Sequence, residues 1–500
     1  MHSGASVSLV GRKLFHLPSG VAIVSRAKRY EQLRDLLAER IHRGVYRCGD
    51  RLPSVRQWCR EQGVSMTTAQ ACFAALEAEG VIEARPRSGY FVTTPTNNTP
   101  LPQRSRPEQR PVLVSRWKQV QALVVGSAPH QPRHALANGM PDLRAKTLLP
   151  LQRLLTQSQR QASLTQFAYD SLAGDAELRR QITHLMSHSG CMRHIDDVIV
   201  TTGCQEALAI ALRLLTQPGD VVAVDSPAFY GAMQMLEARG LKALEIPTDA
   251  EHGISLGALE LALEQWPIKA IMVTPTCNNP LGYSMDDERK RALVELARRH
   301  DVAIIEDDVY GDLAYAAPRP RSLAAFDEDG RVLLCSSVSK TLLPGLRLGW
   351  LAPGRYRDRA LHEKYVSTGS SATLAQGSVA EFMARGHHAR HLSAMRNQYR
   401  LQRDQMRTWV HQYFPQGTRV SAPSGGFMLW LELPEGFDSI ALNQHLAEHR
   451  LEIAPGPLFS ASGKYQRCLR LNFASPLNDD THAAIRLIGD CARAQLLVVS

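Results

Sequence analysis

Lys340 lies in the stretch SSVSKTLLPGLRLGW, residues 336–350, where groups that can bind a phosphate surround one amine. The hydroxyls of Ser337 and Ser339 precede the lysine, and Arg347 follows it. A guanidinium can hold a phosphate through two parallel hydrogen bonds, and a lysine amine can attack a carbonyl carbon and bond to it. The stretch therefore predicts a nucleophilic amine beside an anion site.

A further anion-binding element is expected at VTTGCQEAL, where Gly203 leads from a strand directly into a helix. The N–H groups of Cys204 and Gln205 at the start of that helix can bind an anion, helped by the helix dipole. Alone this is a weak signal, and it gains weight from the residues that accompany it.

Other strand ends carry a carboxylate, a phenol, an amide and an aromatic ring. Asp307 and Tyr310 occur in IEDDVY, Asn279 precedes a proline in TPTCNNPLG, and Phe229 follows a strand in DSPAFYG. With the amine and the phosphate-binding groups they suit pyridoxal phosphate: the carboxylate keeps the ring nitrogen protonated, the phenol and amide bind the phenolate oxygen, and the aromatic ring covers one face. Each residue alone has a simpler explanation: a surface lysine for Lys340, a helix cap for Asp307, a turn former for Asn279 and a core residue for Phe229. The order in which they occur along the chain favours a cofactor site.

The elements that must position these groups are strands alternating with helices. Short apolar runs (VIVTTG, VVAVDSP, AIMVTPT, VAIIEDD, VLLCSS) are separated by amphipathic stretches such as CQEALAIALRLL and DDERKRALVELARRH. This alternation predicts an α/β fold with a mostly parallel sheet covered on both faces. Ligands of such sheets bind at the carboxyl ends of the strands, where the residues named above occur.

The first hundred residues have a different pattern. YEQLRDLLAERIHRG predicts one amphipathic helix, Ser54 can cap a second over VRQWCREQG, and Ser65 can cap a third over MTTAQACFAALEAEG. Helix, glycine turn and helix indicate a helix-turn-helix, and VIEARPRSGYFV reads as two strands joined by a basic turn, the wing.

Charge separates the two parts of the chain. Residues 1–134 carry 20 basic and 9 acidic residues, whereas residues 135–500 carry 38 and 39. The asymmetry favours a polyanion-binding head, with a solvated basic face as the alternative. We expect a disordered extension over 1–24, a winged helix over 25–94 and a Pro- and Arg-rich extended linker over 95–134, whose arginines either contact DNA or only keep it solvated.

Composition excludes several classes of protein. The 500 residues are 44% hydrophobic and 21% charged, which is typical of globular domains. The nine cysteines form no C-x-x-C pair, so we expect neither a disulfide framework nor a metal site. Without a secretory leader or an apolar run long enough for a bilayer, the sequence predicts a cytoplasmic protein that does not engage a membrane.

Residues 26–94 resemble the GntR-type winged helix, through RLPSVRQ and GVSMTTAQACFAALEAEGVIEARPRSGYFV. The resemblance implies binding to a double-stranded DNA operator. Met66 and Gln70 depart from the arginines frequent in the family, which implies a different operator, and capping alone is the alternative explanation for Ser65. The DNA-contacting residues that the resemblance implies are Arg56 for the backbone, Ser65, Thr67, Thr68 and Gln70 for the groove, and Arg85, Arg87 and Gly89 for the wing.

Residues 135–500 resemble the fold-type I, class I/II aminotransferases, a pyridoxal phosphate fold with a smaller C-terminal α+β subdomain. The likeness rests on SSVSKTLLPGLRLGW, NNPLG, DDVY, SGGFMLWLELP and IAPGPLF. It implies that Ser337 and Arg347 hold phosphate, that Tyr169 reaches the neighbouring subunit's phosphate, and that Arg470 in RCLRLNFASP binds a substrate carboxylate. Cys204 and Phe229 depart from the residues usual in the family.

Such a fusion resembles the MocR regulators. The resemblance implies a homodimer whose heads pack on the opposite subunits, an effector that is pyridoxal phosphate or an amino acid, and control of vitamin B6 or amino-nitrogen genes. One alternative is a working aminotransferase that carries a DNA-binding head, since Lys340 and Arg470 are what transamination needs. A nonspecific DNA binder is disfavoured because it leaves the cofactor residues unexplained.

Overall fold

The computed structural model describes residues 29–42, 45–46, 49–78, 81–85, 88–93, 99–115, 117–118, 120–121, 136–161 and 168–499. The expected extension over 1–24 lies outside these ranges. The chain divides into two compact units, Met1–Thr93 and Thr94–Ser500. We call them the head and the body.

The head contains three helices and a two-stranded antiparallel sheet, as the sequence predicts. Ser54 caps the second helix by accepting from the N–H of Gln57 at 3.2 Å, and Gly63 ends it in the left-handed region at φ 60°. A small core around Trp58 and Phe73 holds the elements together. Their bounds are α1 Arg29–His42, α2 Val55–Gln62, α3 Met66–Ala78, β1 Ile82–Arg85 and β2 Gly89–Val92.

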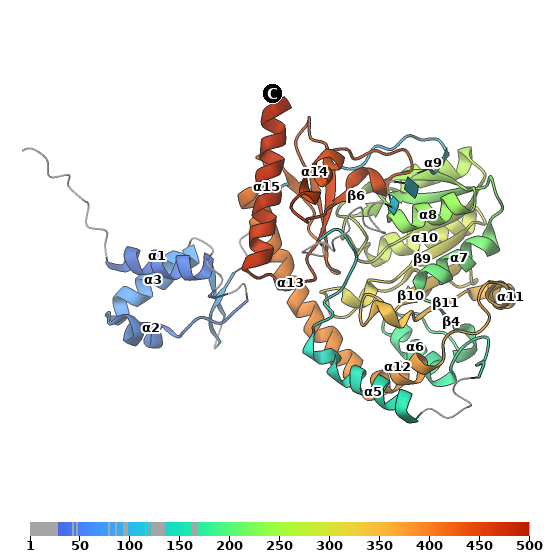
Figure 1. The fold of residues 1–500 in the computed structure, drawn as a ribbon, viewed down its shortest axis with the longest axis horizontal. Coiled ribbons are helices and arrows are strands. Elements are labelled where there is room, and N and C mark those ends of the chain that lie inside the picture. The colour runs from blue at the N-terminus through green and yellow to red at the C-terminus, as the bar shows by residue number, and fades with distance from the viewer. Residues whose placement is uncertain are drawn as a thin grey trace, which may run out of the picture. The chain divides into compact units, whose positions relative to one another are not determined.

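The body is built on a nine-stranded sheet (Figure 1) in the order β3-β6-β5-β8-β9-β10-β11-β4, with β7 added beside β6. Neighbouring strands from β6 to β10 are parallel, whereas β3 and β11 run antiparallel to their neighbours. The predicted strands are all present. The bounds are β3 Val112–Leu113, β4 Ile199–Thr201, β5 Val221–Ser226, β6 Lys242–Asp249, β7 Gly253–Ile254, β8 Ile268–Val273, β9 Ala303–Asp307, β10 Val332–Ser337 and β11 Gly349–Ala352.

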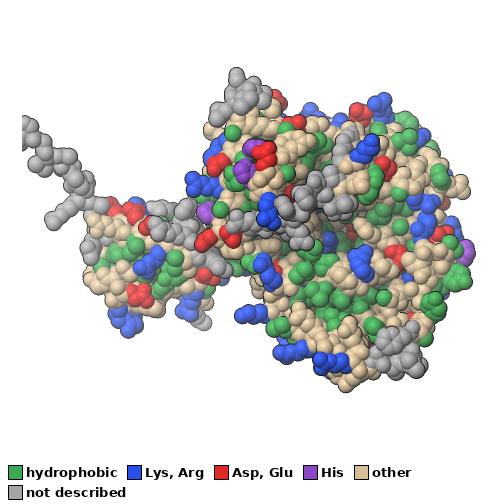
Figure 2. All heavy atoms as spheres, viewed as in Figure 1, with side chains coloured by type: hydrophobic (Ala, Val, Ile, Leu, Met, Phe, Trp, Pro, Cys, Tyr) green, Lys and Arg blue, Asp and Glu red, His purple; other side chains and the backbone are tan. Residues whose placement is uncertain are grey.

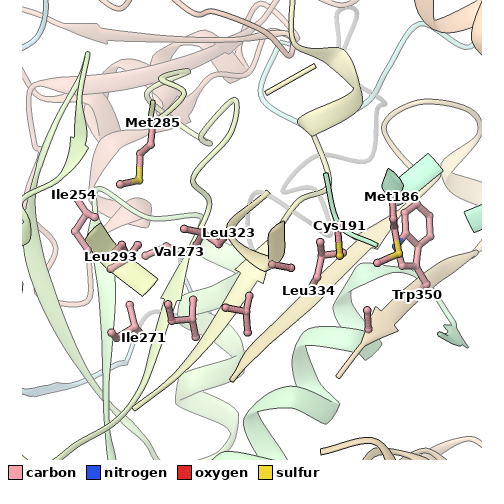
Figure 3. Packing of buried hydrophobic residues seen from close by; sticks show 14 of the residues in the cluster. Met186, Cys191, Ile254, Ile271, Val273, Met285, Leu293, Leu323, Leu334 and Trp350 are labelled. Carbon is pink, nitrogen blue, oxygen red and sulfur yellow. The ribbon is translucent and has the colours of Figure 1, made fainter. Parts of the chain in front are cut away.

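Helices cover both faces of this sheet, which is why its central strands are buried without alternation. On one face, Ile271 of β8, Leu334 of β10 and Trp350 of β11 pack in one layer, with Met186 beside Trp350 (Figure 3). The helices are α5 Leu149–Gln161, α6 Ala176–Ser187, α7 Cys204–Leu215, α8 Tyr230–Ala238, α9 Leu256–Gln265, α10 Asp287–Arg299, α11 Arg357–Ser367 and α12 Leu374–Ala384.

The expected smaller subdomain is a four-stranded antiparallel sheet in the order β12-β13-β15-β14. The long helix α13 leads into it, and its own core cluster includes Phe427 and Phe473. The bounds are α13 His387–Tyr413, β12 Arg419–Val420, β13 Met428–Glu432, α14 Ser439–Ala447, β14 Ala454–Pro455, β15 Cys468–Asn472 and α15 Asp479–Val499.

Part of the expected linker lies on the body. Within residues 95–134, residues 99–115 run along the body, and we call this segment the strap. The N–H of Gln103 donates to Glu432 Oε2 at 2.7 Å, Val420 donates to the carbonyl of Pro100 at 3.0 Å, and Val112–Leu113 forms strand β3 beside β6. The strap belongs to the compact unit of the body rather than lying free between two units.

Across the described ranges, we find no helix with the length and apolar character that crossing a bilayer requires. Within the same ranges, no group of three or more His, Cys, Asp or Glu side chains could hold a metal ion.

Candidate functional site

Lys340 lies just after β10, and its amine points at a backbone carbonyl. Nζ donates to the oxygen of Gly139 at 2.7 Å and lies 6.0 Å from the centre of the Tyr310 ring. Burial, together with the positive charge of Arg470, lowers the pKa of Lys340 from 10.5 to about 8, while Asp307 opposes the shift. An unprotonated amine is the nucleophilic form, so this environment increases the fraction able to react near neutral pH.

Asp307 is the last residue of β9 and is 6% exposed. Its Oδ1 accepts from the N–H of Val309 at 3.2 Å and from the thiol of Cys204 at 3.5 Å. Burial raises the pKa of Asp307 from 3.8 to about 6, and these two donors limit the rise. At pH 7 Asp307 therefore remains mainly a carboxylate. This is the form that can accept a hydrogen bond from a protonated ring nitrogen.

The residues predicted to bind a phosphate, which we call the cup, lie at the ends of β4 and β10 and on the chain that follows them. Gly203 begins α7 at φ 81° without a side-chain cap, and the guanidinium of Arg347 lies so close that a Cβ on Gly203 would be 2.7 Å from it. Arg347 donates to the carbonyl of Thr202 at 3.1 Å. Nearby, Ser337 Oγ accepts from the N–H of Ser339 at 3.2 Å, and both serines are buried. The cup thus combines a helix N-terminus, hydroxyls and a guanidinium.

Arg470, on β15, is fully buried. Its NH1 donates to Asn279 Oδ1 at 3.1 Å and its NH2 to the carbonyl of Ala137 at 2.5 Å. The rings of Tyr230 and Phe459 lie 5.5 and 5.1 Å from its guanidinium carbon. In the described part of the chain its Nε has no hydrogen-bond partner, although that atom is buried. A buried, oriented guanidinium with an unused donor is suited to a carboxylate ligand.

The structure brings most of the predicted residues together but leaves Tyr169 apart from them. Tyr310 is 2% exposed beside Lys340, and burial raises the pKa of its phenol. Phe229 immediately precedes α8, and its ring packs against Tyr230 with centroids 4.9 Å apart. Tyr169 is 96% exposed on the surface, so it contributes nothing to the pocket of its own chain. The side chain of Gln205 is exposed, while its backbone N–H, the group predicted to bind an anion, lies in the first turn of α7.

Sequence reasoning missed the segment 136–142, which supplies the carbonyl groups of Ala137 and Gly139 to the site. Asn472 holds this segment by donating Nδ2 to the carbonyls of Asn138 and Met140, at 2.8 Å each. A Cβ at Gly139 would lie 2.9 Å from Lys340 Nζ, so a larger residue there would displace the end of the lysine side chain. The one signal in the sequence was the Asn-Gly pair in ANGMPDL.

The candidate DNA-binding residues of the head lie on its surface. Arg56, Ser65, Thr67 and Gln70 are exposed, and Thr68 is half-buried. Ser65 caps α3 by accepting from the N–H of Thr68 at 3.1 Å, so its capping role is present in the structure.

The wing has one feature that the sequence did not indicate. Arg51 lies over Gly89 at the start of β2, where a Cβ would be 3.4 Å from its Nε. Arg85 ends β1 and pairs with Glu83 at 2.6 Å while its guanidinium covers the Phe91 ring at 4.3 Å. Arg87 lies outside the described residues.

Comparisons with known proteins agree with this division. Residues 135–488 match aminotransferase class I and II, and residues 29–92 match the bacterial regulatory proteins of the gntR family. The chain is 47% identical to the uncharacterised HTH-type transcriptional regulator YjiR of Escherichia coli, over 92% of this chain and 98% of the relative. It is 29% identical to the probable rhizopine catabolism regulatory protein MocR of Rhizobium meliloti, over 74% of each chain.

Among solved structures, kynurenine aminotransferase of Pyrococcus horikoshii is 27% identical and superposes with a TM-score of 0.68, over 78% of this chain and 96% of that chain. The body is therefore a class I and II aminotransferase fold, a fold of pyridoxal phosphate-dependent proteins, and it is joined to a GntR-type DNA-binding head. The chain belongs to the MocR-type transcriptional regulators, in which these two units are fused.

The residues present fit pyridoxal phosphate. Lys340 supplies an amine of lowered pKa, Asp307 a buried carboxylate, and the cup at Gly203 a place for a phosphate beside Arg347. Cys204, which departs from the family pattern, keeps its backbone N–H at the helix start and donates its thiol to Asp307. The departure leaves the donor set complete.

Proposed function

We propose that the body binds pyridoxal phosphate at Lys340 and an amino-acid effector at Arg470, and that this occupancy changes how the two heads of a homodimer engage an operator. The observation that carries the proposal is the buried arrangement of Lys340, Asp307 and Arg470 in a chain that also has a DNA-binding head. The proposed genes are those of vitamin B6 or amino-nitrogen metabolism, and the proposed location is the bacterial cytoplasm.

Each side chain has a defined task in this proposal. When bound, the cofactor supplies an aldehyde and an electron-accepting ring. Lys340 provides the amine that joins the aldehyde, and Asp307 holds the proton on the ring nitrogen. Tyr310 and Asn279 donate to the phenolate oxygen, Phe229 covers a ring face, and Ser337, Ser339, Arg347 and the N–H groups of Cys204 and Gln205 hold the phosphate.

The effector is recognised by its carboxylate. Arg470 is already fixed by Asn279 and Ala137, so it loses little conformational freedom when a ligand binds. Asn279 and Ala137 each take one donor of Arg470, which leaves Nε and the second hydrogens of NH1 and NH2 for a carboxylate. A ligand that moves residues 136–142 would change the first described residues of the body after the segment 95–134.

A homodimer accounts for features that one chain leaves unused. Tyr169 is 96% exposed, so its side chain is accessible to a neighbouring subunit. Met140, Leu143 and Leu149 are also exposed apolar side chains close in sequence to the site. On the face of the body in Figure 2, hydrophobic side chains gather below its centre. Two heads, each packed on the opposite body, would read two half-sites, which raises affinity without new contacts.

Operator binding with and without cofactor tests the proposal. We expect the affinity or the footprint of the full-length protein to change when pyridoxal phosphate is added to the cofactor-free form, and again when amino acids are added. A ligand can shift such an equilibrium only through different affinities for the two states. Binding that is identical in all three conditions would exclude the switch.

A working aminotransferase is the second candidate, favoured by the intact pair of Lys340 and Arg470. Rapid conversion of the bound cofactor to its amine form by amino acids, with exchange of the resulting keto acid, would support this activity. Spectral change without keto-acid release favours the sensor alone.

A further inference from the structure

The rings of Tyr230 and Phe459 lie against Arg470, and we call them the aromatic wall of the ligand site. We infer that Ser105 of the strap is a positioning residue for this wall. The inference rests on the proposed function, because it assigns the strap a part in the same site. The strap comes from the segment that joins the head to the body, so the chain between the two units would help to hold the wall in place.

Ser105 is 7% exposed and bonds in two directions. Its N–H donates to the carbonyl of Thr248 at 3.2 Å, and its Oγ accepts from the N–H of Thr248 at 2.7 Å. Its hydroxyl also lies close enough to the Tyr465 phenol to lower the pKa of that phenol, against the rise that burial causes. Both partners lie on the body, so one strap side chain connects two separate segments of it.

Those two partners converge on Ser226. Thr248 Oγ1 accepts from the N–H of Ser226 at 3.0 Å, and the phenol of Tyr465 lies 2.5 Å from Ser226 Oγ. Ser226 ends β5 and is followed within four residues by Phe229 and Tyr230. The strap therefore reaches the aromatic residues through two hydrogen bonds in series.

Glu245 connects the segment that carries Tyr230 with the segment that carries Phe459. Its Oε1 accepts from Ser226 Oγ at 2.9 Å and its Oε2 from Ser460 Oγ at 3.0 Å. Ser460 directly follows Phe459, whose carbonyl accepts from the N–H of Ala228 at 3.0 Å. Burial raises the pKa of Glu245, and the serine hydroxyls oppose that rise. This buried carboxyl thus fixes both loops that carry the wall.

The wall in turn contacts the carboxylate-binding arginine. Tyr230 and Phe459 pack edge to face with centroids 5.5 Å apart, and both rings lie against the guanidinium of Arg470. Loss of the strap contact is expected to loosen Ser226 and Glu245, then the wall, and then the orientation of Arg470.

Besides the contacts at Pro100, Gln103 and β3, the strap buries Val114, and the surface beside residues 102–109 is hollowed. Pro102, Ser105 and Pro107 are buried, whereas Gln103, Arg104 and Arg106 are exposed. An open groove of about 1360 Å³ runs along residues 102–109 and is lined on the body side by residues that include Phe437 and Tyr465. A segment seated at the edge of an open groove can detach more readily than one packed on all sides.

Hydrogen exchange of the full-length protein tests the inference. Ser105→Ala removes the strap hydroxyl, and Tyr465→Phe removes the phenol while keeping its ring. We expect each variant to exchange roughly 3- to 10-fold faster in peptides that cover residues 226–231 and 458–462, the range expected for one lost hydrogen bond. Gln103→Ala is the matched control, because its exposed side chain lies on the strap outside the network.

A second measurement follows the cofactor. The dissociation constant for pyridoxal phosphate, read from its visible absorption, should rise by roughly 3- to 10-fold in the Ser105 and Tyr465 variants and stay unchanged in Gln103→Ala. Exchange in both peptides equal to the wild type in both variants would overturn the inference. If the wild type bound no cofactor, the proposed function would fail, and the exchange measurement would still decide the role of Ser105.

Discussion

The head and the body keep their functional groups in opposite environments. Arg56, Thr67 and Gln70 of the head are exposed on a small core, whereas Asp307 and Arg470 of the body are 6% and 0% exposed. Exposed charges act through water and are screened by salt. Buried groups are held by fixed partners, and their pKa values move with burial. The head is therefore suited to a long polyanion, and the body to one small ligand in one orientation.

The largest effect is expected from removing the amine to which the cofactor would be bonded. Lys340→Ala should abolish the visible absorption of bound pyridoxal phosphate, because the amine that joins the aldehyde is gone. Lys269→Ala, which removes an exposed amine on β8, should retain it. Spectra of the purified proteins after incubation with cofactor measure this. A band that persists in Lys340→Ala would contradict the assignment of the amine.

The salt dependence of ligand affinity should distinguish the head from the body almost as clearly. If each head of a dimer neutralises about three phosphates, operator affinity should fall on the order of 10³-fold between about 50 and 200 mM salt, through counterion release. Cofactor affinity should change far less, because Asp307 is buried and only the exposed Arg347 among the charged groups proposed to hold the cofactor is open to screening. Titrations of operator and of pyridoxal phosphate at both salt concentrations measure the contrast. Equal salt slopes for the two ligands would remove the distinction between the regions.

The reactive groups of the body could be predicted from the sequence, because each is marked by the residues next to it in the chain. Asp307, Tyr310 and Lys340 each follow a run of apolar residues that forms a strand, and parallel strands bring their carboxyl ends to one edge. The helix-turn-helix of the head was predictable for a similar reason, since caps such as Ser54 and breaks such as Gly63 act within a few residues.

The contacts that finish the site were not predictable. Gly139 is 201 residues from Lys340, and it contributes a backbone carbonyl, which every residue has. The strap gave an ambiguous signal, because a Pro-rich polar segment has the same composition whether it is free or seated on a surface. Its seating depends on Thr248 and Glu432, which are distant in sequence. Side-chain types predict chemistry, but long-range backbone partners require the fold.

Within the body, a substitution of Arg470 should distinguish the effector site from the cofactor site. It should lower the affinity for the amino acid without removing the cofactor. Arg470→Met keeps similar bulk but loses the charge-assisted hydrogen bonds, so amino-acid affinity should fall on the order of 10- to 100-fold. The absorption of bound pyridoxal phosphate should remain and also serves as the control for folding. Arg486→Met, on the exposed face of α15, is the matched substitution. Amino-acid titrations followed by the cofactor spectrum give the affinities; equal values in the two variants would exclude Arg470 as the carboxylate site.

The smallest expected effect is a pH dependence that distinguishes a buried amine from an exposed one. Burial brings the pKa of Lys340 from 10.5 to about 8, and only the unprotonated amine reacts. Because the folded pKa is lowered, the rate of cofactor incorporation should rise about tenfold per pH unit below pH 7 and level off above about pH 8. A free lysine derivative, whose amine has an ordinary pKa, should still gain rate at about pH 10. Stopped-flow mixing of cofactor-free protein with pyridoxal phosphate measures the profile, and a rate that keeps rising like that of the free amine would show that Lys340 reacts from a solvated position.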